Sequence, residues 1–237
     1  TSFGLGTVDG GVAFVFPGQG SQYVGMGGAV AINAEPALAA WDAVADLELG
    51  EHSLQDVVYP RPVFTPEDDA AQSQRITATE WAQPAIGVTS QAYLAVARAV
   101  GLTPDAVAGH SYGEVTALHA AGCYDAETMV RIARKRGELM RDAAGGDGTM
   151  TAVARPAEEV LAALETAKIA DVVLANHNHP TQVILSGPTA AVEAAEAALD
   201  AQGITCRRLN VATAFHSKVV APAEAPFRGF LDEVPGT

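Results

Sequence analysis

The order of helix-like and strand-like segments predicts an α/β protein in which a small unit interrupts a larger one. Three observations carry this prediction. A short run of β-branched and aromatic residues ends at a Pro-Gly pair at 17–18, and a second short apolar run leads directly into the pentapeptide GHSYG at 109–113. Turn residues then follow a regular rhythm over 148–209.

The first half of the chain is expected to hold two short strands and several helices. The strands are expected over 12–16 and 106–108, each ended by turn residues. Apolar residues recur with helical spacing in four segments: 29–47, 79–100, 114 onward and 125–140. Three prolines and an acidic run mark 59–69 as a surface connection.

The segment 148–211 alternates strands and helices in a fixed order. The expected elements are strand 149–154, helix 156–167, strand 171–175, strand 182–186, helix 189–202 and strand 206–211. This βαββαβ order is that of the ferredoxin-like unit. We therefore expect a small domain over 148–211, inserted in a larger α/β domain that takes 12–147 and 212–237, after a Gly-rich leader over 1–11.

Composition and charge exclude several classes of function. With 49% apolar and 18% charged residues the chain is globular, and its net charge of −14 would repel a nucleic acid. No run approaches the ~20 apolar residues of a membrane span, and no secretion signal opens the chain, so we expect a cytoplasmic protein without a membrane anchor. Cys123 and Cys206 lack metal-ligand spacing, which argues against a zinc site or a disulfide framework. The start at Thr1 suggests a domain cut from a longer polypeptide.

The pentapeptide around Ser111 fits the pattern G-x-S-x-G, which places a serine on a sharp turn between a strand and a helix. Glycines flank such a serine because a Cβ would collide with the tight backbone. The serine Oγ then lies at a helix N-terminus, where N–H groups can stabilise an oxyanion. The alternative is a Gly-rich turn whose serine only caps a helix. The expected strand and helix on either side favour a nucleophile.

A serine nucleophile needs a base, and the chain offers six histidines: His52, His110, His119, His177, His179 and His216. Side chains of neighbouring residues on a tight turn diverge, so the histidine adjacent to Ser111 is interpreted as structural. The one at 119 is expected to be packed or at the surface, the one at 52 lies in a polar stretch, and the pair at 177 and 179 is assigned to a loop over 176–181. His216, in AFHS at 214–217, is the candidate base.

Arg136 interrupts an apolar stripe on the expected helix over 129–141. The stripe consists of Met129, Ile132, Ala133, Leu139 and Met140, and the polar side consists of Arg131, Arg134, Lys135, Glu138 and Arg141. A guanidinium in an apolar stripe requires an anionic partner, and its fork suits a carboxylate. That partner is either an acidic residue of the protein or, downstream of a nucleophilic serine, a substrate carboxylate.

The loop FPGQGSQ at 16–22 has glycines on both sides of Gln19. They would let the Gln19 N–H approach a ligand closely, as an oxyanion hole requires, although the loop is also compatible with a simple turn. It contains no phosphate-loop lysine, so a nucleotide site is not supported.

Six motifs together resemble one family. In order along the chain they are FPGQGSQ, GHSYGE at 109–114, KRGELM at 135–140, GTMTAV at 148–153, ANHNHPTQVILSG at 175–187 and AFHS. In this order and spacing they resemble the malonyl-CoA:acyl-carrier-protein transacylases and the acyltransferase domains of polyketide synthases. The resemblance covers residue 12 to about residue 220.

The resemblance implies an α/β-hydrolase-like large subdomain with an inserted ferredoxin-like one. It implies that Ser111 is acylated, that His216 is its base in a Ser-His dyad, and that backbone N–H groups of Gln19 and Tyr112 form the oxyanion hole. Further binding residues implied by the resemblance are Arg136 for the malonyl carboxylate, with Gln83 and Phe215 lining the same site.

The implied reaction moves a malonyl group from malonyl-CoA to the phosphopantetheine thiol of an acyl carrier protein in polyketide or fatty-acid synthesis. The implied partners are that carrier protein, the CoA thioester and other domains of the same synthase. No metal and no resident cofactor are expected. Two alternatives are a serine hydrolase or thioesterase-like enzyme, for which Arg136 would have no purpose on a neutral ester, and an inactive truncated docking fragment.

Two departures from the family's pattern bear on these expectations. The family normally continues for several dozen residues after AFHS, so the C-terminal part of the large subdomain is expected to be missing from this chain. The residue before Ala214 is Thr213, where polyketide-synthase members often carry His or Tyr. Tyr112 and the continuation ALHAAG suggest the iterative synthases that make enediynes or polyunsaturated fatty acids.

An acidic chain that binds an acidic partner needs a locally positive surface. The candidate cations are Arg131, Arg134, Lys135, Arg207, Arg208 and Lys218. We expect either that they form one rim around the active-site cleft or that they belong to solvated surfaces with little effect.

Overall fold

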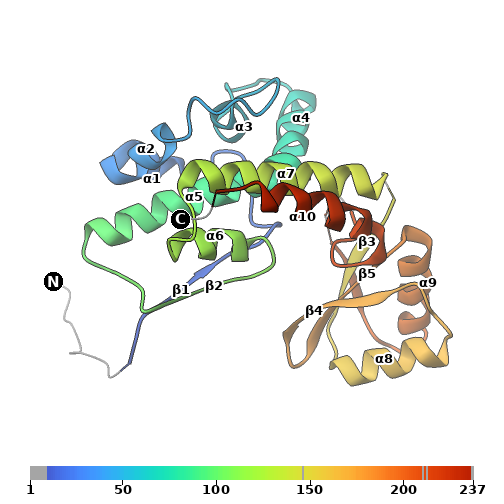
Figure 1. Cartoon of the computed structure of the whole chain (residues 1–237). Helices are drawn as coiled ribbons and strands as arrows, with labels where there is room; N and C mark the ends of the chain where they lie inside the picture. Colours follow the sequence, from blue (N-terminus) through green and yellow to red (C-terminus); the bar gives the residue numbers. More distant parts are fainter. Residues whose placement is uncertain (1–9, 146, 210, 212, 236–237) are drawn as a thin grey trace. The chain divides into compact units, whose positions relative to one another are not determined.

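A computed structural model describes residues 10–145, 147–209, 211 and 213–235 (Figure 1). The described residues divide into two compact units. Unit 1 holds 10–62, 83–133 and 235, and unit 2 holds 63–82 and 134–234. The dividing points fall inside helix α5 (Thr79–Ala99) and inside helix α7 (Ala126–Ala144). Each unit is described separately below.

Unit 1 is built on two parallel strands, β1 (Ala13–Phe16) and β2 (Ala106–Gly109). Ala13 lies opposite Ala106 and Phe16 opposite Gly109, so the two strands end at the same edge. Both strands are where the short apolar runs predict them. The helices that belong wholly to this unit are α1 (Gly28–Asn33), α2 (Glu35–Asp42), α3 (Leu54–Val58) and α6 (Gly113–Ala120).

The core of unit 1 beside this sheet joins the strands to two helices. Phe16 of β1, Leu94 of α5 and two alanines of α6 form a buried cluster, against which Phe14 and Val107 pack. Phe14 and Phe16 lie two residues apart, so both point to the same face of β1. Their packing in this cluster joins the short strands to α5 and α6.

Unit 2 contains the predicted order of strand, helix, strand, strand, helix and strand. The elements are β3 (Thr149–Val153), α8 (Ala157–Thr166), β4 (Val173–His179), β5 (Gln182–Gly187), α9 (Thr189–Asp200) and β6 (Cys206–Arg208). The strands form an antiparallel sheet with the spatial order β4-β5-β3-β6.

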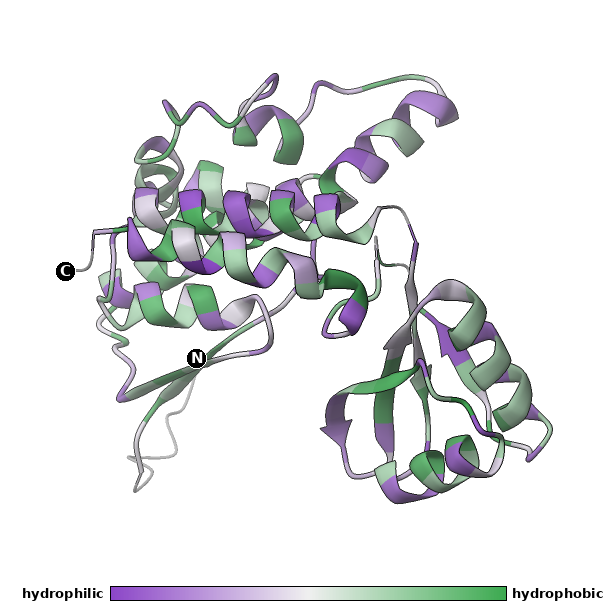
Figure 2. Cartoon of the chain, turned by 45° about the vertical axis from the view of Figure 1, so that its right-hand side comes forward, coloured by the Kyte–Doolittle hydropathy of each residue, from purple (hydrophilic) through white to green (hydrophobic). Residues whose placement is uncertain are grey.

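The two faces of this sheet bury different clusters. Helices α8 and α9 cover one face (Figure 2). On that face Val153, Val183 and Leu185 pack with helix residues such as Val160 and Leu199. The other face carries a cluster that includes Met150, Ala152 and Ile184 from the strands, Met140 from α7 and Phe215. The 3-10 helix η1 (Lys218–Ala223) adds to this cluster, and helix α10 (Glu224–Asp232) follows it.

Three predicted boundaries are wrong. The segment 59–69 is not wholly a connection, because helix α4 (Pro66–Thr77) begins within it; Thr65 caps this helix by accepting from Asp68 N at 3.2 Å, and the acidic run forms its first turn. Strand β4 runs on to His179, beyond the predicted end at 175. Strand β6 ends at Arg208, not at 211, and residue 210 of the predicted strand lies outside the described residues.

No helix among the described residues is both long and apolar enough to cross a membrane. Cys123 and Cys206 are both free thiols, the first exposed and the second half-buried. The predicted leader over 1–11 lies almost entirely outside the described residues, which begin at residue 10.

Candidate active site

Ser111 occupies a sharp turn between β2 and α6. Its φ of 53° lies in the left-handed region, which is uncommon for any residue other than glycine. The turn is held by hydrogen bonds from His110 N to Phe16 O at 3.0 Å and from Gly113 N to His110 O at 2.9 Å. Ser111 is half-buried and directly precedes the N-terminal turn of α6. Backbone strain of this kind at a serine is typical of a nucleophile held by a tight turn.

The glycines around Ser111 are there because neighbouring backbone leaves no space. A Cβ on Gly109 would overlap the carbonyl carbon and oxygen of Gly113, and a Cβ on Gly113 would overlap Phe16 O. Both contacts are with backbone, which cannot move away as a flexible side chain can. The predicted reason for the pattern G-x-S-x-G is therefore confirmed.

The first loop lies directly against this turn. A Cβ on Gly18 would be 2.5 Å from His110 O and 3.1 Å from His110 Nδ1, so Gly18 has no room for a side chain. Gln19 follows and is half-buried, and its side-chain Oε1 accepts a hydrogen bond of 3.4 Å from Nε2 of Gln83. Gln83 is completely buried in α5. The structure thus brings Gln19, Gln83 and the Ser111 turn together within unit 1.

Tyr112 points its side chain into the core of unit 1. The residue is completely buried, and a Cβ on Gly87 would overlap its hydroxyl oxygen, which shows how closely the ring packs against α5. Its backbone is helical, with φ −55° and ψ −33°, at the N-cap of α6. Tyr112 therefore combines a buried anchor with a backbone N–H in the turn that follows Ser111.

Two other histidines have structural positions. His119 Nδ1 lies 2.8 Å from Tyr124 O, which ties the end of α6 to the following turn. Burial raises the pKa of Tyr124 to about 12, so its hydroxyl stays protonated and donates to Val115 O at 2.6 Å. His179 Nδ1 lies 3.0 Å from Thr181 Oγ1.

The prediction that His177 and His179 belong to a loop is wrong. Both are in strand β4, which pairs with β5 across a tight turn at Pro180–Thr181. The polar run ANHNH resembles a loop because β4 is an edge strand whose last residues are exposed, and two irregularities in its register disrupt the apolar alternation.

His216 is on a second strained turn, in unit 2. Its φ is 57°, again in the left-handed region. The residues before it are fixed, since Ser186 Oγ donates to Phe215 O at 2.6 Å and Ser217 Oγ donates to Ala214 O at 2.8 Å. Gly148 leaves no room for a Cβ beside Ala214. Phe215 is 8% exposed and belongs to the cluster on the sheet face away from α8 and α9.

Arg136 shares a helix face with buried residues of α7, as the spacing predicts. Ile132 and Met140, one turn on either side, are buried, and Arg136 itself is half-buried. Arg134, which the spacing assigns to the polar side of the helix, is largely covered. Its side chain is 14% exposed, because its guanidinium carbon lies 4.0 Å above the ring of Trp81.

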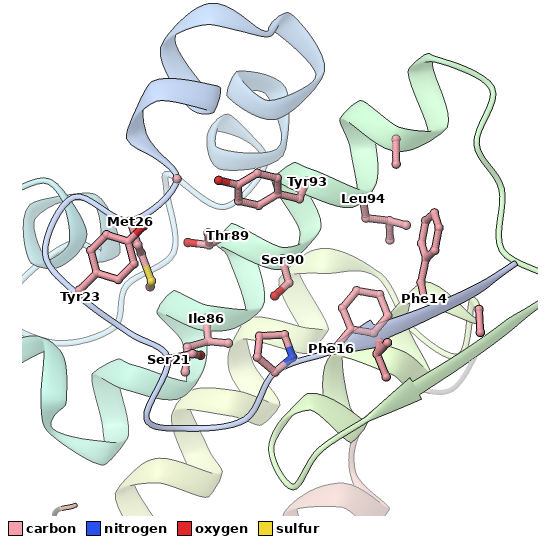
Figure 3. Close-up of a pocket in the computed structure, with 15 residues that line it drawn as sticks. Phe14, Phe16, Ser21, Tyr23, Met26, Ile86, Thr89, Ser90, Tyr93 and Leu94 are labelled. Carbon is pink, nitrogen blue, oxygen red and sulfur yellow. The ribbon is translucent and has the colours of Figure 1, made fainter. Parts of the chain in front are cut away.

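A cavity of about 470 Å³ lies beside β1 and α5 in unit 1 (Figure 3). Figure 3 shows Phe14 and Phe16 from β1 and Thr89, Ser90 and Tyr93 from α5 around it. None of the predicted site residues lines this cavity, although Phe16, Pro17 and Ser21 of the FPGQGSQ motif do.

Each unit therefore carries part of the predicted site. Unit 1 holds Ser111, Tyr112, Gln19 and Gln83, and unit 2 holds Arg136, Phe215 and His216. A mixed α/β fold with a strained serine between a strand and a helix is an arrangement typical of α/β proteins that use a serine nucleophile.

Comparison with known proteins specifies the family within this class. Residues 13–234 match the model of the acyl transferase domain, so the chain belongs to the acyl transferase domain family. It is 38% identical over 227 residues to the malonyl CoA-acyl carrier protein transacylase of Bacillus subtilis (strain 168), covering 93% of this chain and 68% of that protein. The polyketide biosynthesis protein PksE of the same strain is 35% identical over 224 residues, covering 93% of this chain.

A solved structure shows the same fold. That structure is described as a type II polyketide synthase acyl-carrier protein in complex with its malonyl-transacylase. The matched chain has a TM-score of 0.84 and 29% identity, and the match covers 96% of this chain and 72% of the matched chain. This chain spans only part of these relatives: it covers 27% of the length of PksE and 68% of the length of the transacylase.

Proposed function

We propose that the protein transfers a malonyl group from malonyl-CoA to the phosphopantetheine thiol of an acyl carrier protein. The observation that carries this proposal is the strained Ser111 at the start of α6, in a chain of the acyl transferase domain family. The names of its relatives, which include malonyl transacylases and polyketide biosynthesis proteins, support the choice of acyl group and acceptor.

The proposed reaction has two half-reactions. Ser111 Oγ attacks the thioester carbonyl while His216 accepts the hydroxyl proton, and the collapse of the tetrahedral intermediate releases CoA, whose sulfur takes that proton. The carrier-protein thiol then attacks the malonyl ester, its proton passes to His216, and His216 returns a proton to the Ser111 oxygen as it leaves. Backbone N–H groups of Gln19 and Tyr112 bind the oxyanion in both half-reactions. These steps need no metal and no resident cofactor.

The proposal includes an arrangement of subdomains. We assign 148–211 to a ferredoxin-like subdomain inserted in an α/β-hydrolase-like one formed by 12–147 and 212–237. The antiparallel order β4-β5-β3-β6 supports the first assignment, and the parallel pair β1-β2 leading into the Ser111 turn supports the second. A cytoplasmic location stays a prediction from the sequence.

Arg136 is proposed to bind the free carboxylate of the malonyl group, with Gln83 and Phe215 lining the same site. Replacing Arg136 by alanine would leave that carboxylate desolvated and without its partner, at a cost of about 2 to 5 kcal/mol. Acylation by malonyl-CoA should therefore slow by a factor between ~30 and several thousand, whereas acylation by acetyl-CoA should change little. Acylation rates from rapid-quench mass spectrometry with each thioester give the comparison. Equal losses with both would assign Arg136 to the fold, not to the substrate.

A hydrolase differs from this proposal in the acceptor. It would release free malonate at a rate unaffected by carrier protein, whereas a transferase holds its malonyl ester until a phosphopantetheine thiol arrives. Measuring both products with and without carrier protein distinguishes the two functions.

The candidate cations differ in their availability to a partner. Arg131 pairs with Glu127 at 2.6 Å, and Arg208 is bound by Glu196 at 2.9 and 2.5 Å on the face that α9 covers. Arg207 lies opposite Ala152 in the sheet, on the other face, and is exposed. In the described part of the chain no acidic group pairs with it. We propose Arg207, together with Lys135 and Lys218, as contacts for an acidic carrier protein.

Charge reversal tests the role of Arg207. Arg207→Glu should lower kcat/KM for the carrier protein by about three- to tenfold at low salt, because long-range attraction raises the rate of encounter. Added salt should shrink the difference. Arg155→Glu is the matched control, since it changes the net charge equally at a different exposed arginine. Unchanged kinetics of Arg207→Glu at low salt would reject this contact.

A further inference from the structure

The contacts of Arg134 point to a role in substrate choice. We infer that Arg134, stacked on Trp81 and bonded to the first turn of α5, is a positioning residue that holds the α7 turn carrying Arg136 in the orientation needed to select a carboxylate-bearing acyl group. This inference rests on the proposed function of Arg136.

Arg134 joins two helices inside unit 2. Its guanidinium carbon lies 4.0 Å above the Trp81 ring, its Nε donates to Glu138 Oε1 at 2.7 Å, and a terminal nitrogen donates to Glu80 O at 3.2 Å. A stacked guanidinium with bonds in its own plane uses the geometry that distinguishes arginine from lysine. The bond to Glu138 spans the helical turn that contains Arg136.

The same turn is fixed from the other side by Gly137. A Cβ on Gly137 would lie 2.5 Å from Glu80 Cα and 2.5 Å from Thr79 O, so the backbones of α7 and α5 touch there. Residues 134, 137 and 138 are thus all held, and Arg136 lies between them.

The cluster also contains a buried carboxylate that is only partly compensated. Glu80 Oε1 accepts from Arg141 at 2.8 Å, and hydrogen bonds to Glu80 and then Asp142 raise the pKa of Arg141. The second oxygen of Glu80 is buried without a hydrogen-bond partner among the described residues. The bond from Arg141 therefore adds a further contact between α7 and the start of α5, beside the bond from Arg134 to Glu80 O.

The physical reason for such positioning is the flexibility of Arg136. A long guanidinium side chain loses about 2 kcal/mol of rotamer entropy when it is fixed, and a misplacement of about 1 Å in a binding group can cost ~10²-fold in rate. A rigid helix turn sets the starting point of the side chain. Arg134 would therefore act on the discrimination between acyl groups more than on acylation in general.

The test compares malonyl-CoA with acetyl-CoA. For Arg134→Ala we expect the ratio of their acylation rate constants to fall about tenfold, with an intermediate fall for Arg134→Lys, which keeps the charge but not the planar stack. Arg155→Ala, which removes an arginine from an exposed i,i+4 pair with Glu159, should leave the ratio unchanged. Circular dichroism and thermal unfolding establish that each variant is folded.

The outcomes separate this inference from the function on which it rests. If Arg136→Ala lowers the ratio and folded Arg134→Ala does not, the positioning role is wrong and the proposed function stands. If Arg136→Ala leaves the ratio unchanged, the proposed role of Arg136 fails and this inference fails with it. Should Arg134→Ala not fold, Arg134→Lys, which keeps the charge and the aliphatic stem, decides by the same ratio.

Discussion

Replacement of Ser111 by alanine is expected to abolish the acyl-enzyme that forms with malonyl-CoA. Ser111 is placed, by its φ of 53° and by the glycines packed around it, on a strained turn that presents its hydroxyl at the start of a helix. Removal of Oγ leaves no atom to carry the acyl group. Intact-mass measurement after incubation with malonyl-CoA gives the result directly.

Two further variants make the Ser111 result specific. Ser111→Cys keeps a nucleophile at the same position, so a thioester adduct should still form. Ser53→Ala removes an exposed hydroxyl that caps α3 by accepting from Asp56 N at 3.0 Å, so it should cost about 1 kcal/mol of stability and leave the adduct intact. A full adduct on Ser111→Ala would show that another side chain is acylated.

His216→Ala is expected to slow acylation by about 10² to 10⁴, which is the usual contribution of a positioned general base. The left-handed backbone at His216 and the hydrogen bonds that fix Ala214 and Phe215 indicate a side chain held in one direction at a cost in strain. The residual acylation rate of His216→Ala should rise as the pH is raised, because hydroxide can replace the missing base at high pH.

His110→Ala is the comparison for His216. His110 is adjacent to Ser111, and its ring packs against Gly18, so its loss should reduce stability more than the rate of acylation. If His216→Ala acylates at the parental rate and a folded His110→Ala does not, the base has been assigned to the wrong histidine.

The turn at Ser111 could be predicted from sequence because its chemistry is local. The glycines at 109 and 113 are needed by backbone contacts within a few residues and with β1, and the apolar run before them marks the strand that leads into the turn. The same holds for the order of elements over 148–211, where each strand and helix has its own turn residues.

Features that depend on distant residues could not be predicted in this way. Helical spacing placed Arg134 on the polar side of α7, and only the packing of Trp81 from another helix shows that it is covered. The polar residues at the end of β4 have the composition of a loop, and only their pairing with β5 shows that they form a strand. The hydrogen bond between Gln83 and Gln19 joins two segments that are far apart in the sequence, and residue spacing alone does not predict that they meet.

The measurement that tests the central claim most directly is the mass of the protein after incubation with malonyl-, methylmalonyl- and acetyl-CoA, followed by peptide mapping and addition of a carrier protein. The proposed function predicts one malonyl group per chain on the peptide that contains Ser111, more adduct from malonyl-CoA than from acetyl-CoA, and its transfer to the phosphopantetheine thiol. A folded protein that gains no malonyl group, or gains it on a different peptide, would contradict the proposal.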